Sequence, residues 1–250
     1  MQIVLLTALG VGGATVIGSV IGFLFKKLSH KFSDVILAFA AGVMLAAAVI
    51  GLILEALDCG GKHALIITIA GIFAGALAVN LLDGLVPHLH RLTGADTSNV
   101  EASEKLSKVL LFVCAIAIHN LPEGIAAGVG FGTGNVSEAL TIAGAIALQN
   151  IPEGMVIIAP MLSAGISPSK TFLAALSTGV IEVIGTLIGF FAVSISQAIL
   201  PFALAFAGGT MLYVIGHEMI PETHAHGCET PATYSLLAGF CLMLVMDFYL

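Results

Sequence analysis

Eight long apolar segments divide this sequence, and they exclude most water-soluble folds. A helix needs roughly 20 apolar residues to cross the hydrocarbon core of a bilayer. Only 9% of the residues are charged, whereas soluble domains have about 25%. The sequence therefore predicts an all-α integral membrane protein, with residues 1–250 forming a single eight-helix transmembrane domain. The expected spans are 2–25, 34–57, 63–87, 108–130, 137–162, 170–195, 199–220 and 231–249.

The basic residues predict an orientation, because cytoplasmic loops carry an excess of Lys and Arg. Of the 8 Lys and Arg residues, all but Lys62 fall in the odd-numbered loops. This predicts a multi-pass protein of the cell membrane with both termini extracytoplasmic and a polar cytoplasmic loop at about 88–107. The net charge of -7 does not indicate a nucleic-acid partner, since most of the chain is expected to lie in lipid.

Two related motifs lie in neighbouring spans. Residues 119–124 read H-N-L-P-E-G and residues 149–154 read Q-N-I-P-E-G. Residues four apart share one face of a helix, so His119 lies over Glu123, and Gln149 over Glu153. An α-helix rises about 1.5 Å per residue, so counting from a short turn near Gly134 places the two motifs at overlapping heights. Each helix therefore offers a pair of ligands near the middle of the bilayer.

The asparagine of each motif predicts a second cation position. Asn120 and Asn150 are rotated by about 100° from the first residue of their own motif. They point at a neighbouring position along the same interface, where Glu123 and Glu153 could serve both cations. Glu182, about twelve residues into the sixth span, adds a third carboxylate at this depth. Such groups cost about 2.5–3.5 kcal/mol or more inside lipid and indicate function.

The types of side chain favour a transition metal. Imidazole suits Zn, Fe, Cu or Ni, whereas carboxylates and amides shift the preference toward Mn, Fe and Cd. Calcium would more naturally be bound by oxygen alone. Met44, near the middle of the second span, would by itself be a core residue. We therefore predict a path for a divalent metal ion and no catalytic cofactor.

The two motifs, the eight spans and the polar loop after the third span resemble the ZIP family of metal transporters, and within it the prokaryotic branch called GufA-like. The resemblance implies inverted repeats of helices 1–3 and 6–8 around helices 4–5, and a homodimer. It implies that Zn²⁺ or Fe²⁺, and in some members Mn²⁺ or Cd²⁺, moves into the cytoplasm by alternating access, as one bundle moves against the other.

The resemblance also implies a role for each matching position. One metal ion would be bound by Met44, His119, Glu123, Gln149 and Glu153. A second would be bound beside it by Asn120, Asn150 and Glu182, with both motif glutamates shared. Asp58 and Asp247 would lie at the external entrance. The cytoplasmic exit would be lined by Asp34, His217 and Glu218.

Asn150 departs from the family pattern, because close relatives have Asp at this position. The second metal position here loses one negative charge and is expected to be the weaker of the two. We expect Asn150→Asp to strengthen it.

The sequence fits three other functions less well. Residues 217–221 read H-E-M-I-P, and a zinc-protease helix requires a second His where Pro221 stands. An intramembrane zinc hydrolase using His217, His224 and His226 remains the alternative, although we expect no enzyme. A purely structural membrane protein would not retain so many polar groups at this depth. A proton or alkali-ion channel using Glu123, Glu153 and Glu182 would not require His119.

Overall fold

The computed structural model describes residues 1–24, 29–92, 120–163 and 166–249, and all the secondary structure in them is helical. Residues 120–130 form one helical segment, which ends in the short turn η3 (Phe131–Thr133). The long helices are α1 (Gln2–Leu24), α2 (His30–Ala46), α4 (Ala64–Leu92), α6 (Val136–Ser163), α7 (Pro168–Ile195), α8 (Leu200–Val214) and α10 (Glu229–Tyr249).

Within the described residues, 7 helices are long and apolar enough to cross a membrane. The prediction of an all-α integral membrane protein is thus confirmed. The expected fourth span, 108–130, is described only from residue 120, so the count of eight stays a prediction. Helix α4 runs on to Leu92, five residues beyond the expected end of the third span. The remainder of the predicted loop, 93–107, lies outside the described residues.

Two spans contain a π-helical segment. The second span continues from α2 through η1 (Ala47–Leu54) into α3 (Glu55–Cys59) and ends at the turn η2 (Gly61–His63). The seventh starts after the turn η4 (Gln197–Ile199) and continues from α8 through η5 (Ile215–Met219) into α9 (Ile220–Thr223). Such segments are rare and frequently lie at functional sites. The one in the seventh span contains His217 and Glu218.

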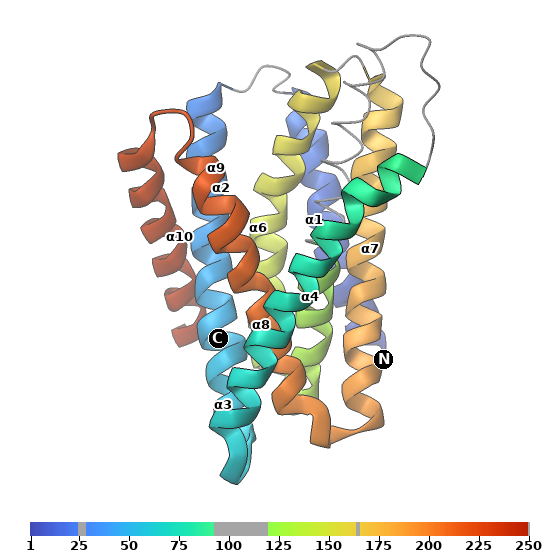
Figure 1. Ribbon diagram of the computed structural model, residues 1–250, viewed down its shortest axis with the longest axis vertical. Coiled ribbons are helices and arrows are strands. Elements are labelled where there is room, and N and C mark those ends of the chain that lie inside the picture. The colour runs from blue at the N-terminus through green and yellow to red at the C-terminus, as the bar shows by residue number, and fades with distance from the viewer. Residues whose placement is uncertain (25–28, 93–119, 164–165, 250) are drawn as a thin grey trace.

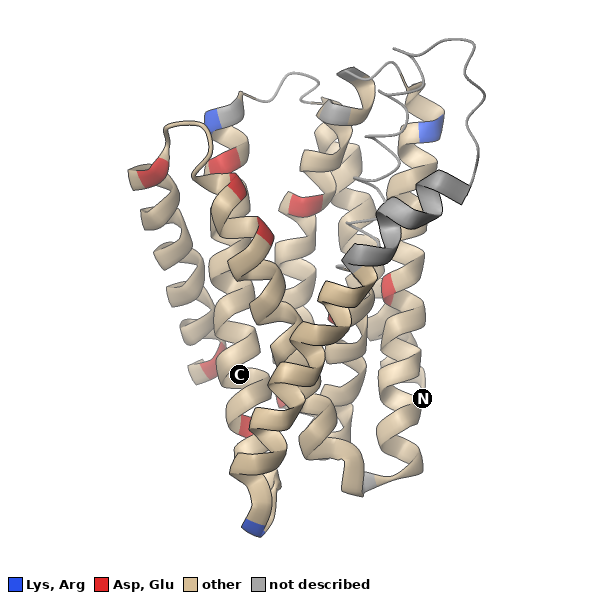
Figure 2. Cartoon of the chain, viewed as in Figure 1, with Lys and Arg blue, Asp and Glu red and all other residues tan. Residues whose placement is uncertain are grey.

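Most of the long helices run up and down along the long axis of the molecule, whereas α4 slants across them (Figure 1). Both chain termini lie in the lower half of the view, as expected when both are on the same side of the membrane. Lys and Arg of the described residues lie at the two ends of the molecule, whereas some Asp and Glu lie along its length (Figure 2). Two of these acids, Glu123 and Glu182, are fully buried, whereas many large apolar side chains are exposed.

A sharp turn determines where the second motif lies on α6. Gly134 has φ of +80°, a conformation that costs glycine little. The side chain of Asn135 then accepts hydrogen bonds from the backbone nitrogens of Ser137 (3.1 Å) and Glu138 (3.3 Å). This is the arrangement of a helix N-cap. Helix α6 therefore begins at a defined residue, and it continues without interruption through the motif at 149–154.

The helices form two bundles. In the α1–α6–α7 bundle, α1 packs on both α6 and α7, and the helical residues 120–130 contact α7. In the α2–α4–α8–α10 bundle, α4 packs on α8, and α2 packs on α10. The two bundles meet mainly where α6 lies against α2 and η1.

Glycines bring backbones together inside each bundle. A Cβ atom at Gly18 of α1 would overlap the carbonyl oxygen of Ile151, and one at Gly42 of α2 would overlap that of Leu236. Such close approach is the usual means of packing helices in lipid. The described glycines that approach the opposite bundle, Gly51, Gly132 and Gly144, meet only side-chain atoms there. Among the described glycines, close backbone contact therefore occurs within the bundles and not between them.

Candidate metal site

The described residues expected to bind metal lie on four elements. Asn120 and Glu123 belong to the helical residues 120–130, and Gln149, Asn150 and Glu153 lie on α6. Glu182 lies on α7 and Met44 on α2. All are buried except Glu153, which is half-buried. His119 lies outside the described residues.

The two motifs face each other directly. Gln149 donates a hydrogen bond from Nε2 to Oε1 of Glu123, with 2.8 Å between the two atoms. This contact joins the first residue of one motif to the glutamate of the other. The predicted overlap in height of the two motifs therefore agrees with the described geometry.

The carboxylate of Glu182 lies beside the asparagines of both motifs. Oε1 accepts hydrogen bonds from Asn120 Nδ2 and from Thr15 Oγ1, the latter at 2.7 Å. Oε2 accepts from Asn150 Nδ2 at 2.8 Å. Thr15, on α1, is fully buried. Its role was not predictable from the sequence, because a single threonine in an apolar helix commonly bonds to its own backbone.

Several oxygens of these residues have no hydrogen-bond partner although they are buried. We call them the unpaired-oxygen cluster: Asn120 Oδ1, Glu123 Oε2, Gln149 Oε1, Asn150 Oδ1 and Glu153 Oε1. Buried polar atoms are normally paired, and each exception needs an explanation. Amide and ionised carboxylate oxygens only accept hydrogen bonds, so a cation is the group that would satisfy them together.

The nitrogen ligand expected for this site is His119, outside the described residues. Within the described parts of the chain, no group of three or more His, Cys, Asp and Glu side chains could hold a metal ion. The described portion of the site is instead a mixture of carboxylates and amides. Its donor set therefore consists of oxygen atoms, with the thioether of Met44 buried on the neighbouring helix.

The expected entrance residues, Asp58 on α3 and Asp247 on α10, are both exposed. Two further acids lie with them. Glu138, in the first turn of α6, forms a side-chain hydrogen bond with Glu55 and interacts electrostatically with Asp247 and Asp58. Glu55 and Glu138 were not predicted from the sequence, because they lie in different spans.

The expected exit residues lie at the ends of their spans that are opposite to the entrance residues. Asp34 is buried near the start of α2, and its Oδ1 accepts a hydrogen bond from His226 Nδ1 at 3.1 Å. Its second oxygen has no partner. His217 is exposed and Glu218 half-buried, both in η5. The pairing with His226 was not predicted, since the two residues are far apart in sequence.

The alternative hydrolytic zinc site is not favoured. His224 donates to the carbonyl oxygen of Ile220 at 2.9 Å, near the end of α9, and His226 pairs with Asp34. Both histidines and His217 belong to the described residues, where no metal-holding group of His, Cys, Asp and Glu occurs. His224 therefore bonds to the end of a helix and His226 to Asp34, which does not favour a zinc centre built from these histidines.

Comparison with known proteins identifies the family. A protein-family model described as "ZIP Zinc transporter" matches residues 86–247. The chain is 38% identical over 249 residues to the zinc transporter GufA of Myxococcus xanthus, covering 97% of each protein. The chain belongs to the ZIP family.

Other relatives agree with this assignment. The zinc transporter ZIPB of Bordetella bronchiseptica is 38% identical over 94% of this chain and 77% of its own length. The zinc transporter ZupT of Chlorobaculum parvum is also 38% identical, over 94% of this chain and 92% of its own length. The similarity to GufA and to these prokaryotic transporters confirms the predicted branch. These relatives are named as transporters and not as enzymes, which agrees with the expectation that this chain is not an enzyme.

Proposed function

We propose that this chain carries Zn²⁺ across the cell membrane into the cytoplasm, with Fe²⁺, Mn²⁺ and Cd²⁺ as further candidate ions. The observation that carries the proposal is the unpaired-oxygen cluster, which gathers acceptor oxygens from both ZIP motifs. The names of the relatives, all zinc transporters, support the choice of Zn²⁺ as the principal ion.

A cation accounts for the cluster better than a structural role does. Burying a polar group without a partner is costly. Among the described residues, no Lys or Arg forms an ion pair with Glu123 or Glu153. In the proposed first position, Met44, His119, Glu123, Gln149 and Glu153 bind the metal. The imidazole and the thioether favour a transition metal over Mg²⁺ or Ca²⁺.

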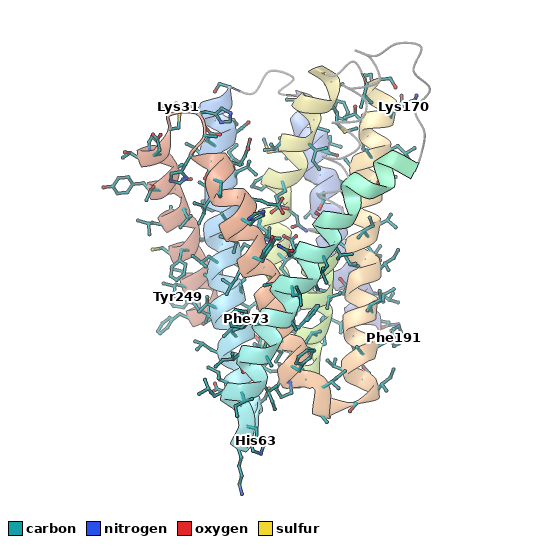
Figure 3. The ribbon with its side chains drawn as sticks, in the orientation of Figure 1. Lys31, His63, Phe73, Lys170, Phe191 and Tyr249 are labelled. Carbon is teal, nitrogen blue, oxygen red and sulfur yellow. The ribbon has the colours of Figure 1, made fainter. Side chains whose placement is uncertain are left out.

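The proposed direction is inward, past Asp58 and Asp247 and out past Asp34, His217 and Glu218. Lys31 and Lys170 lie at one end of the molecule and His63 at the other (Figure 3). The excess of basic residues in cytoplasmic loops makes the end with Lys31 and Lys170 the cytoplasmic one. Lys26, Lys27, Lys105 and Lys108, which support the same orientation, lie outside the described residues.

The proposed transport step is a movement of the α1–α6–α7 bundle against the α2–α4–α8–α10 bundle. Backbone contacts at glycines favour rigid bundles, because a helix cannot slide past a carbonyl group that fills its groove. Helix α2 and η1, against which α6 packs, are rich in buried alanines: Ala40, Ala41, Ala46, Ala47 and Ala48. Small side chains form a smooth surface and make sliding less costly.

The outer surface is suited to a lipid environment, and a second copy of the chain could pack against it. Apolar side chains such as Phe73, Phe191 and Tyr249 are exposed, at 71%, 47% and 78%, and side chains of this kind surround the helices (Figure 3). We propose that residues 1–250 act as one transmembrane domain and assemble as a homodimer. Chemical cross-linking in intact membranes, followed by denaturing electrophoresis, tests the dimer.

Metal-resolved uptake into proteoliposomes tests the proposed function. A trapped Zn²⁺-sensitive dye would be used to compare the wild type with Glu153→Gln and with Glu229→Gln. Glu229 is an exposed acid at the start of α10, so its variant is a charge-matched control. We expect Glu153→Gln to slow uptake at least about tenfold and the control to match the wild type.

Two outcomes would contradict this proposal. One is wild-type uptake no faster than that of empty liposomes. The other is a K⁺ or proton flux that persists without Zn²⁺ and survives His119→Ala, which would favour an alkali-ion or proton channel.

A further inference from the structure

A tyrosine lies against the histidine of the proposed exit. The rings of Tyr213 on α8 and His217 in η5 have centroids 5.0 Å apart and an angle of 31° between their planes. Residues four apart share one face of a helix, and this separation is typical of interacting aromatic rings. Tyr213 is half-buried and His217 is exposed. The tyrosine therefore supports the imidazole on one side without enclosing it.

A side chain of another helix holds this tyrosine. Asn80 on α4 donates a hydrogen bond from Nδ2 to Tyr213 Oη, with 2.8 Å between the two atoms. Helix α4 slants across the molecule (Figure 1) and packs on α8. The tyrosine ring is therefore held at its tip by Asn80 as well as at its base by its own backbone, and its orientation is restricted.

Asn80 occupies an unusual place for an amide. It is exposed and lies within an apolar membrane span, where polar side chains are costly and commonly functional. A bond that only ties α4 to α8 is not needed, because glycines already bring the two backbones together. A Cβ at Gly75 would overlap the carbonyl oxygen of Phe206, and one at Gly209 would overlap that of Ile72. The hydrogen bond to Tyr213 therefore calls for a reason other than helix packing.

The surroundings of His217 are open. A Cβ atom at Gly216 would meet no atom within 4 Å, and both Gly216 and His217 are exposed. Both residues belong to the π-helical segment η5, and such segments frequently lie at functional sites. An ion that approaches the imidazole therefore meets no side chain at residue 216, and Tyr213 is the aromatic ring against which His217 rests.

We infer that Tyr213 is a positioning residue for His217 and that Asn80 holds Tyr213 in place. Neither residue contacts the ion. The tyrosine ring limits the orientations of the imidazole, so a ring nitrogen already points at the departing ion when it arrives. Residues behind a metal ligand commonly orient it in this way. This role rests on the proposed function, in which His217 lines the cytoplasmic exit.

Zn²⁺ uptake into proteoliposomes tests the inference with variants that remove one contact at a time. Tyr213→Leu removes the ring and should lower the maximal uptake rate about tenfold, since outer partners of metal ligands contribute about 10–100-fold. Tyr213→Phe and Asn80→Leu remove the same hydrogen bond from its two ends. Each of them and their combination should cause one equal, smaller loss, because a single bond is lost only once. The Zn²⁺ concentration for half-maximal uptake should stay within about twofold, since the proposed binding site is unchanged.

A double-mutant cycle with His217 separates positioning from packing. His217→Ala should lower the maximal rate, and adding Tyr213→Leu should cause no further loss, because the ring then has no imidazole to orient. A purely structural tyrosine would slow transport by the same factor with and without His217. Tyr234→Phe changes an exposed tyrosine of α10 and is the matched control. It should transport as the wild type does, and the metal-free melting temperature of Tyr213→Phe should match that of the control.

Tyrosine fluorescence gives a readout that does not depend on transport. The chain has 3 tyrosines and no tryptophan, so tyrosine emission is observed without an indole signal. Titrating the purified protein in detergent with Zn²⁺ should change this emission, because an ion bound to His217 places positive charge beside the Tyr213 ring. The change should persist in Tyr234→Phe and be lost in Tyr213→Phe and in His217→Ala.

Three results would overturn the inference. They are wild-type uptake rates for Tyr213→Leu and Asn80→Leu, an effect of Tyr213→Leu that is equally large without His217, and a Zn²⁺-dependent emission change that survives Tyr213→Phe. In each of these cases Zn²⁺ uptake by the wild type and its loss in Glu153→Gln would still support the proposed transport function. Wild-type uptake no faster than that of empty liposomes would overturn both.

Discussion

Gln149 and Glu123 are joined by a 2.8 Å hydrogen bond that links the two ZIP motifs across neighbouring helices. The bond uses one oxygen of the glutamate and the nitrogen of the amide. It leaves Glu123 Oε2 and Gln149 Oε1 in the unpaired-oxygen cluster. The contact therefore orients two proposed ligands at once.

Replacing Gln149 by Leu should slow Zn²⁺ uptake about tenfold or more, because it removes one acceptor oxygen and the donor that orients Glu123. Replacing it by His, which supplies a nitrogen ligand, should retain more activity than Leu does. Initial uptake rates in proteoliposomes at several Zn²⁺ concentrations would measure both. Equal uptake rates for Gln149→Leu and the wild type would show that Gln149 is not a ligand of the proposed site.

Replacing Asn150 by Asp should strengthen the second metal position. The substitution adds a negative charge beside the cation and removes the hydrogen bond to Glu182 Oε2. We expect about tenfold tighter binding of the second Zn²⁺ by calorimetry. The metal-free protein should melt at a lower temperature, because two carboxylates then face each other in a buried place. Unchanged affinity together with unchanged melting would contradict the expectation.

Replacing Gly154 by Ala should destabilise the α1–α6–α7 bundle, because the added methyl group overlaps the carbonyl oxygen of Thr15. Overpacking of this kind typically costs about 1–3 kcal/mol. Gly144→Ala is the control on the same helix, since a Cβ there meets only the terminal methyl of Met246, at 3.5 Å. Thermal melting in detergent and Zn²⁺ uptake should both fall for Gly154→Ala and stay near wild type for Gly144→Ala.

Joining the two bundles covalently should stop transport. Gly51 of η1 faces the side chain of Ile142 on α6, so cysteines at these positions lie on opposite bundles and close together. In a background without the native cysteines, the oxidised Gly51→Cys/Ile142→Cys variant should lose Zn²⁺ uptake, and reduction should restore it. Uptake that persists after complete cross-linking would exclude a relative movement of the bundles at this point.

The sequence predicts the membrane helices and the meeting of the two motifs well, because both depend on local patterns. Apolar length determines a span, and residues four apart on a helix share a face. The role of Thr15 could not be predicted, because its hydroxyl meets Glu182 only after α1 and α7 pack together. The same is true of Glu138 and His226, whose partners lie in distant spans.

The π-helical segments also had no signal in the sequence. Residues 47–54 read A-A-V-I-G-L-I-L, an apolar run that would equally suit an ordinary α-helix. The fourth span was predicted from 108, and its part before residue 120, including His119, lies outside the described residues. The proposed nitrogen ligand is therefore supported by the motif alone, whereas the proposed oxygen ligands are supported also by the unpaired-oxygen cluster.

The contacts of Gly124 and Gly154 matter for anyone who wishes to alter which ion this carrier accepts. Gly124 admits the carbonyl oxygen of Glu182, and Gly154 admits that of Thr15. Thr15 is not an expected ligand, yet its hydroxyl donates to the carboxylate of Glu182. Varying Thr15 and the two glycines would change the surroundings of the proposed site while every expected ligand keeps its chemical identity.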